Sequence, residues 1–298
     1  MSMKRNILVT GASGFVGLHL LRKLKETGFT VIAMDRNPGA LLPSGIQSFQ
    51  GDLCDPATFV HLPKTFWGVV HLAAISVPGQ FSTPEPVVQN LQMTMNLLDH
   101  LESARVLLVS SCHVYAPATQ PQAEDAPLLP QGGYGMSKFL CEQLLPYYGT
   151  KLDIRIARPF NHVGPGMRPE LMVPSMMRRI LDQGNQDHNP VIMRGNDSIR
   201  DFIDVRDVAS AYLKILKLSE PKGRIYNVCS GRAVPIRDVV HEGLRLIGSS
   251  RGVEFQSAPS SQDDIPFLVG NPERLHRETG WTAAFSLQES LRALLPNH

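Results

Sequence analysis

Short apolar runs alternate with longer stretches of helical periodicity through the first half of the chain. Six runs have the length of strands: Asn6–Val9, Phe29–Met34, Ile46–Gln50, Gly68–Leu72, Arg105–Ser110 and Leu152–Ala157. Helical patterns lie between them at Phe15–Lys25, Val87–Glu102 and Tyr134–Tyr147. Strands that alternate with helices form βαβ units, in which the strands are parallel. The pattern therefore predicts an α/β fold built on a Rossmann doubly wound parallel sheet.

The second half of the chain has a looser pattern. After Arg158, prolines and glycines separate short helical and strand-like segments, as in a smaller α+β lobe. The stretch Asp204–Val228 returns to the strand and helix alternation of the first half. We therefore predict a main domain over residues 1–160 with a return segment at 204–228, and a smaller lobe formed mainly by residues 161–298.

Composition and charge are those of a soluble globular protein. Hydrophobic residues make up 43% and charged residues 19% of 298 positions, and the net charge is +2 with no block of like charge. That balance argues against a nucleic-acid partner. No stretch approaches the roughly 18 apolar residues of a membrane span. The apolar run behind the basic N-terminus covers only Ile7–Val9, which is too short for a signal peptide, so we expect a cytoplasmic protein with no membrane partner.

The four cysteines do not have the pattern of a metal site. Cys54, Cys112, Cys141 and Cys229 are far apart and lack the spacing of metal ligands. We expect buried thiols in a reducing compartment, and no metal cofactor.

A glycine-rich turn follows the first strand and opens the first helix. Gly11, Gly14 and Gly17 have the spacing G-x-x-G-x-x-G, one residue longer at its start than the dinucleotide-binding form G-x-G-x-x-G. The first glycine permits the tight bend, the second lets the backbone approach a pyrophosphate, and the third allows the helix to pack on the sheet. The helix N-terminus then offers amide donors to the phosphates. Strand, turn and helix together favour a dinucleotide site over a glycine-rich turn without a ligand.

Asp35 and Arg36 bear on the choice of dinucleotide. Asp35 ends the second strand, where a carboxylate can accept hydrogen bonds from the adenosine ribose. A carboxylate there repels a 2′-phosphate and favours NAD(H), whereas Arg36 is able to hold that phosphate and leaves NADP(H) possible. Asp52 and Leu53, after the third strand, are candidates to cap the adenine, and Asp52 is equally suited to forming a turn.

Tyr134 and Lys138 have the spacing of a proton-transfer pair. Positions i and i+4 share one face of a helix, so the phenol and the ammonium project into one site. A free tyrosine titrates at about 10, and a neighbouring ammonium lowers that pKa by favouring the phenolate. Such a pair is suited to moving a proton on and off a hydroxyl while a hydride leaves the same carbon, and that chemistry requires a nicotinamide.

These motifs together resemble the extended short-chain dehydrogenase/reductases, the epimerase/dehydratase superfamily that acts on nucleotide-linked sugars. The resemblance runs through almost the whole chain. Further segments that show it are His71–Ala74, Asn90, Ser110–Tyr115, Arg158–Gly166 and Arg200–Val208. Within the superfamily, the chain is most similar to the reductases of GDP-4-keto-6-deoxy-mannose, at Arg158–Gly166, Tyr226–Gly231 and Asp264–Gly270.

The resemblance implies roles for particular residues. Ser111 corresponds to the catalytic Ser/Thr that hydrogen-bonds the reacting sugar oxygen, Tyr134 to the general acid/base, and Lys138 to the group that binds the nicotinamide ribose. The implied cofactor site comprises Gly11, Ser13, Gly14, Phe15, Val16, Gly17, Asp35, Arg36, Asp52, Leu53, Leu72, Ala73, Ala74, Tyr134 and Lys138. The implied site for a nucleotide-diphosphate sugar comprises Ser76, Ser111, Cys112, His113, Asn161 and Arg200.

Two of these residues have a second interpretation. In the resembled enzymes Asn161 would contact the diphosphate region and Arg200 would pair with a phosphate oxygen. Alternatively, Asn161 satisfies the backbone of its loop, and Arg200 pairs with Asp201 or Asp204 at the surface.

The chain departs from the family pattern at two places. Many sugar-nucleotide dehydratases have an acidic pair directly after the catalytic Ser/Thr, and here those positions are Cys112 and His113. An unperturbed histidine titrates at about 6.5, so His113 is a possible acid/base, and a loop histidine bonded to backbone is the alternative. Relatives often have an arginine near the tail that grips the second phosphate. This chain has Ser260–Asp263 there, so either diphosphate binding is weaker or another residue substitutes, with Arg168 and Arg178 as candidates.

Three functions are compatible with these residues. The first is an NDP-4-keto-6-deoxyhexose 4-reductase, in which Tyr134 protonates the C4 oxygen as hydride arrives. The second is a 4-epimerase, or a dehydratase using His113, with NAD tightly retained. The third is a non-catalytic dinucleotide-binding protein. The resemblance also implies a homodimer through the helices at Val87–Glu102 and Tyr134–Tyr147, whose apolar residues equally suit inward packing.

Overall fold

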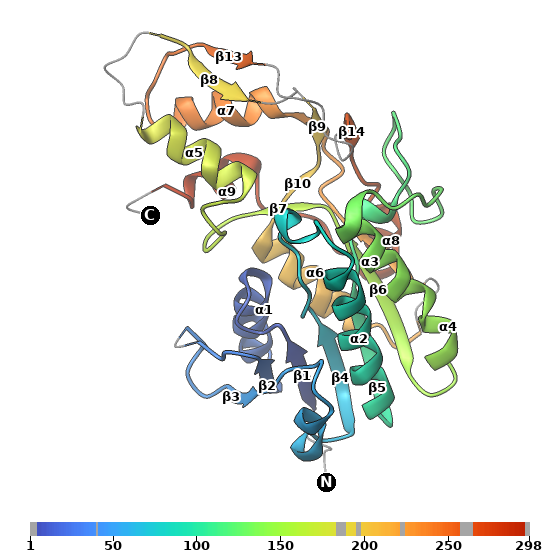
Figure 1. The fold of residues 1–298 in the computed structure, drawn as a ribbon. Helices are drawn as coiled ribbons and strands as arrows, with labels where there is room; N and C mark the ends of the chain where they lie inside the picture. The colour runs from blue at the N-terminus through green and yellow to red at the C-terminus, as the bar shows by residue number, and fades with distance from the viewer. Residues whose placement is uncertain are drawn as a thin grey trace.

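A seven-stranded parallel sheet forms the centre of the molecule (Figure 1). The computed structural model describes residues 5–39, 41–182, 189–194, 198–220, 224–256 and 265–295. The strands, in spatial order, are β3 (Gln47–Gln50), β2 (Thr30–Asp35), β1 (Asn6–Thr10), β4 (Thr65–His71), β5 (Ser103–Val109), β6 (Asp153–Pro159) and β11 (Ile225–Val228). The order reverses between β1 and β4, and the carboxyl ends of these strands border the crevice where such sheets bind ligands. The predicted Rossmann fold is confirmed.

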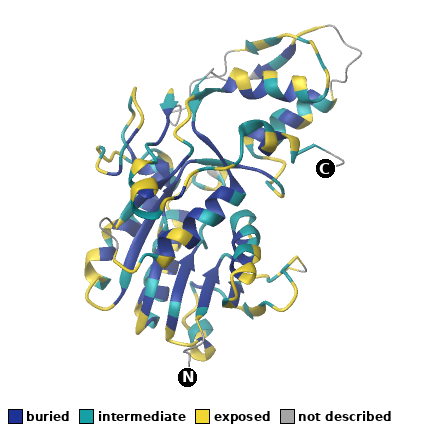
Figure 2. Cartoon of the chain, turned by 180° about the vertical axis from the view of Figure 1, so that it is seen from behind, coloured by how far each residue is buried: buried dark blue, intermediate teal, exposed yellow. Residues whose placement is uncertain are grey.

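Helices cover both faces of this sheet. On one face lie α1 (Phe15–Glu26) and α6 (Val205–Lys217), and on the other α2 (Glu85–His100) and α3 (Gly132–Gln143). Ile7 and Val9 of β1 pack toward α1 and α6, whereas Leu8 packs toward α2 and α3, because successive residues of a strand point to opposite faces. The inner strands of the sheet are accordingly largely buried, whereas the edge strand β3 is not (Figure 2).

Segments from the second half of the chain complete the sheet domain. α6 lies beside α1, and β11 pairs with β6. α8 (Glu273–Thr279) packs on β11, and its Leu275 is buried in the same core as α1 and α6. The sequence pattern did not indicate the contribution of α8, because its seven residues are too few for a clear period.

The remaining elements form a smaller lobe beyond the carboxyl edge of the sheet (Figure 1). Its helices are α5 (Met172–Asp182), α7 (Ile236–Leu246) and α9 (Leu287–Arg292). Its strands and the strands that connect it to the sheet are β7 (Asn161–Val163), β8 (Val191–Arg194), β9 (Ile199–Arg200), β10 (Phe202–Asp204), β12 (Val234–Pro235), β13 (Val253–Gln256) and β14 (Phe267–Leu268). Within the residues described, no helix is long and apolar enough to cross a membrane.

The predicted helix at Tyr134–Tyr147 is two helices in the structure. α3 ends at Gln143, and α4 (Leu145–Tyr148) follows after one residue. Pro146 explains the break, because proline has no N–H to donate and its ring clashes with the carbonyl four residues earlier. Three short 3-10 helices were also not predicted: η1 (Pro56–His61), η2 (Pro78–Gln80) and η3 (Cys112–Val114).

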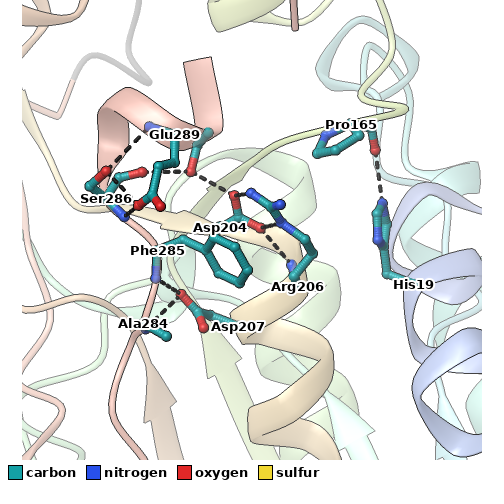
Figure 3. Close-up of polar contacts among 10 residues, drawn as sticks. His19, Pro165, Asp204, Arg206, Asp207, Ala284, Phe285, Ser286 and Glu289 are labelled. Carbon is teal, nitrogen blue, oxygen red and sulfur yellow. Dashed lines mark hydrogen bonds and ion pairs between the residues drawn. The ribbon is translucent and has the colours of Figure 1, made fainter. Parts of the chain in front are cut away.

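A polar junction connects the lobe to the sheet domain (Figure 3). Asp204 caps α6 and accepts two hydrogen bonds from the Arg206 guanidinium, at 2.8 and 2.7 Å, and one from Ser290 of α9 at 2.7 Å. Asp207 accepts from the backbone N–H groups of residues 284 and 285, both at 3.0 Å. The start of α6 therefore ties the C-terminal segment to the sheet domain.

Candidate active site

The glycine-rich turn between β1 and α1 fits closely against the chain that leaves β4. Gly11 has a φ of +66°, and a Cβ there would lie 2.7 Å from the backbone N of Ala73. A Cβ at Gly17 would lie 2.5 Å from the carbonyl O of Ala12, so α1 packs directly on the turn. A side chain fits neither position. The backbone of the turn, the start of α1 and Leu72–Ala74 thus lie together at the crevice. This arrangement suits the binding of a pyrophosphate.

Asp35 lies across this turn at the end of β2. Its Oδ2 accepts from the Ser13 N–H at 3.0 Å and its Oδ1 from the Asn37 N–H at 3.3 Å, while Arg36 is exposed. The carboxylate is therefore at the place where dinucleotide folds bind the adenosine ribose.

The side chains of Asp52 and Leu53 make contacts within the protein that do not involve an adenine site. Asp52 Oδ1 accepts from the Cys54 N–H at 2.9 Å, which is the turn-forming role considered above. Leu53 is buried in the core beneath β2 with Met34. The residues that fit a dinucleotide best are thus the glycines, the start of α1 and Asp35.

Ser111 and Tyr134 meet at the carboxyl end of β5. Ser111 is buried, accepts from the His113 N–H at 3.2 Å, and lies close enough to Tyr134 for its hydroxyl to lower the pKa of the phenol. α3 lies directly on η3, since a Cβ at Gly135 would be 2.5 Å from the carbonyl O of His113. This close approach places Tyr134 beside Ser111, an arrangement in which both hydroxyls can serve a single substrate oxygen.

Lys138 follows Tyr134 by one helical turn but does not set the pKa of the phenol. Its Nζ donates to the carbonyl O of Val109 at 2.8 Å and is 5.9 Å from the centroid of the Tyr134 ring. Burial raises the pKa of Tyr134, and the nearby Ser111 hydroxyl opposes this rise only in part. Burial also lowers the pKa of Lys138. The expectation that the ammonium lowers the tyrosine pKa is therefore wrong for this structure, because desolvation dominates, and Tyr134 is protonated at neutral pH.

Cys112 and His113 occupy the positions of the dehydratase acidic pair. Cys112 is buried, and desolvation raises its pKa to about 12, so its thiol is protonated at neutral pH. The His113 ring lies edge-on to Tyr134, with centroids 6.1 Å apart, and Phe81 flanks Tyr134 at 5.9 Å. Neither side chain beside Ser111 is a carboxylate.

Two of the predicted substrate residues, Asn161 on β7 and Arg200 on β9, lie on strands between the sheet and the lobe. Asn161 Nδ2 donates to the backbone O of Asp201 at 3.3 Å, as in the loop-satisfying interpretation. Arg200 donates to the carbonyl O of Ile199 at 3.0 Å and is close enough for its charge to lower the pKa of Cys112. Both carboxylates considered for Arg200 have other partners: Asp201 accepts from Ser230 and Gly231, and Asp204 from Arg206.

Two arginines were candidates to grip the second phosphate. Arg168 donates to Ser76 Oγ at 3.5 Å, so these two residues from different parts of the chain meet near the crevice. Arg178 lies on α5 beside Gly166 and Met167, at the edge of a separate hollow. The tail positions Ser260–Asp263 lie outside the described residues.

The structure adds His71 and Asn90 to the surroundings of the site. Both are buried, and both belong to segments that show the family resemblance. Their partners are up to 61 positions away in the sequence, so no local pattern could have indicated these contacts.

Comparison with known proteins decides the family. Residues 7–229 match the NAD dependent epimerase/dehydratase family. The chain belongs to this family. The chain is 36% identical to GDP-6-deoxy-D-mannose reductase from Pseudomonas aeruginosa, and the match covers 98% of this chain and 97% of that one. Like its relatives, this family member is a nicotinamide-dinucleotide-binding enzyme.

Two solved structures of family members illustrate the range of relatives. The structure of RMD from Pseudomonas aeruginosa complexed with NADPH is 31% identical, with a TM-score of 0.82 over 98% of this chain and 96% of that one. The UDP-glucose 4-epimerase of Thermus thermophilus in complex with NAD is 26% identical, with a TM-score of 0.82 over 97% of both chains. This chain is therefore similar both to a reductase and to an epimerase.

Proposed function

We propose that this family member is a reductase that delivers a hydride to C4 of a nucleotide-diphosphate 4-keto-6-deoxyhexose, with the GDP-linked sugar as the first substrate to test. The observation on which the proposal rests is Tyr134 beside Ser111, followed by Cys112 and His113 where a dehydratase has its acidic pair. A 4-keto sugar needs a proton donor at its oxygen, which a phenol of raised pKa provides. The 36% identity to GDP-6-deoxy-D-mannose reductase supports the same choice.

The proposed mechanism uses the two hydroxyls together. The glycine-rich turn, the start of α1 and Asp35 would hold NAD(P)H, which would supply the hydride when bound. Ser111 donates to the C4 carbonyl oxygen and stabilises the charge that develops there. Tyr134 transfers its proton to the same oxygen, which yields the C4 alcohol, and the phenolate then regains a proton from solvent. Lys138 has the family's role at the nicotinamide ribose, and Arg200 binds the diphosphate side of the sugar nucleotide.

One measurement separates this function from the 4-epimerase that the Thermus relative supports as a second candidate. The purified protein is denatured, and any released nicotinamide is identified by absorbance and mass. A reductase is expected to release little and to consume added NADH or NADPH with the 4-keto sugar. Stoichiometric NAD, with turnover that needs no added cofactor, would contradict the reductase and favour the epimerase.

For the dinucleotide, we propose NAD(H) in preference to NADP(H), on the basis of Asp35. The Asp35→Asn variant removes the charge that repels a 2′-phosphate, so its ratio of kcat/KM for NADPH over NADH is expected to rise by about tenfold or more. Asp55→Asn is the control, because Asp55 caps η1 through the Ala57 N–H and has no part in the proposed ribose site. An unchanged ratio in Asp35→Asn would contradict the role of Asp35.

We propose a homodimer through the outer face of α2, α3 and α4. Val88, Met136 and Tyr147 on these helices are 60%, 41% and 82% exposed, so apolar surface is available there for a partner subunit. Val88→Lys combined with Met136→Lys is expected to yield a monomer in light scattering, whereas Val60→Lys, at a similarly exposed position on η1, leaves the mass unchanged. A wild-type monomer would refute the proposal.

A further inference from the structure

A continuous set of buried hydrogen bonds runs from the strand before the glycine-rich turn to the helix that holds Tyr134 and Lys138. His71, at the end of β4, is its central member and is 2% exposed. Its Nδ1 is 2.8 Å from the hydroxyl of Thr10 on β1, and its Nε2 is 3.2 Å from the hydroxyl of Thr94 on α2.

The donors and acceptors of this set are compatible with one form of the imidazole. Thr94 donates its proton to the carbonyl O of Asn90 at 2.9 Å, so it accepts from His71, and Nε2 carries the ring proton. Burial, together with the charge of Lys138, lowers the pKa of His71 to about 3, so the ring is neutral. Nδ1 must then accept from the Thr10 hydroxyl, which itself accepts from the Ala73 N–H at 3.3 Å.

The far end of the set is attached to α3 on both sides of Lys138. Asn90 donates to Ser137 Oγ at 3.0 Å, and Ser137 donates to the carbonyl O of Tyr134 at 2.8 Å. Thr94 is also 3.3 Å from the Sγ of Cys141. Through Thr94 and Asn90, His71 therefore connects the backbone around the glycine-rich turn with the residues next to Lys138.

We propose that His71, as a neutral Nε2–H imidazole, is a positioning residue that holds α3 against the glycine-rich turn and so keeps Tyr134 and Lys138 in register with the bound dinucleotide. His71 touches no reacting atom, and its effect passes through Thr94 and Asn90. The inference rests on the proposed function for the roles of Tyr134 and Lys138. A helix displaced by about 1 Å can cost on the order of a hundredfold in rate.

Four variants test the proposal. His71→Leu removes both ring hydrogen bonds, and Thr94→Val removes the acceptor of Nε2–H at nearly constant shape. His71→Gln restores a donor and an acceptor. Thr279→Val is the matched control, because Thr279 on α8 likewise donates to the carbonyl four residues earlier and accepts from an N–H, outside the site.

The expected result is a specific effect on α3. In His71→Leu and Thr94→Val, kcat per folded enzyme falls by about 10- to 100-fold, while KM for the dinucleotide changes by less than about threefold. Amide hydrogen exchange in α3 becomes faster in these two variants, and His71→Gln recovers much of the loss. Thr279→Val keeps both kcat and exchange in α3. Nitrogen NMR of labelled histidine shows wild-type His71 neutral and protonated at Nε2 between pH 5 and 9.

Other results would overturn the proposal. Unchanged kcat and unchanged hydrogen exchange in Thr94→Val would contradict it, even if His71→Leu does not fold. A wild-type His71 that carries its ring proton at Nδ1 would contradict it as well. Hydrogen exchange and NMR need no substrate. If the wild type does not turn over the 4-keto sugar, the proposed function fails, while these two measurements still decide the role of His71.

Discussion

The Tyr134→Phe variant is expected to lower kcat by about 10²- to 10⁴-fold, the range typical of a general acid, and to leave dinucleotide affinity within about threefold. The substitution removes only the hydroxyl beside Ser111, and the ring keeps its contacts with Phe81 and His113. Steady-state kinetics and dinucleotide titration measure the two effects separately.

The pH dependence provides a second test of Tyr134. Because burial raises its pKa, the donor form predominates through neutral pH, so kcat of the wild type is expected to be flat there and to fall only in alkaline solution. Tyr147→Phe, which changes a tyrosine that is 82% exposed on α4, is the control and should behave as wild type. Near-normal turnover by Tyr134→Phe would mean that another group donates the proton.

The Glu142→Leu variant is expected to reduce the free energy of unfolding by about 3–5 kcal/mol, because it leaves a buried guanidinium without its counter-ion. Glu142 on α3 accepts from Arg158 Nε at 2.9 Å and from Nη2 at 2.6 Å, and the two side chains are 3% and 1% exposed. The remaining partners of Arg158 are the carbonyl O of Glu124 and the Tyr115 ring. Urea denaturation measures the loss.

Glu242→Leu is the matched control for this prediction. Glu242 and Arg245 on α7 form the same two-bond pair, at 2.6 and 2.8 Å, but the Arg245 side chain is 60% exposed. Water already solvates this pair, so its loss is expected to have little effect on stability. Equal losses in the two variants would show that burial does not govern the strength of the Glu142–Arg158 pair.

Much of the fold could be predicted from the sequence because it depends on local backbone requirements. The strand ending at Thr10, the turn with Gly11 at positive φ, and the helix beginning at Phe15 lie within one short stretch, so residue type and spacing suffice to predict them. Tyr134 and Lys138 could be paired for the same reason, since a helix places i and i+4 on one face. Ser111 had no such local signal and was found only through the family resemblance.

The sequence by itself determined the parallel sheet, the glycine-rich turn and the shared face of Tyr134 and Lys138, because each depends on residues close together in the chain. Only the tertiary structure decided the charge states and the orientations. It buried Tyr134 and raised its pKa, directed Lys138 to Val109, and placed His71 between Thr10 and Thr94. These outcomes depend on desolvation and on partners distant in sequence, which exist only once the chain has packed.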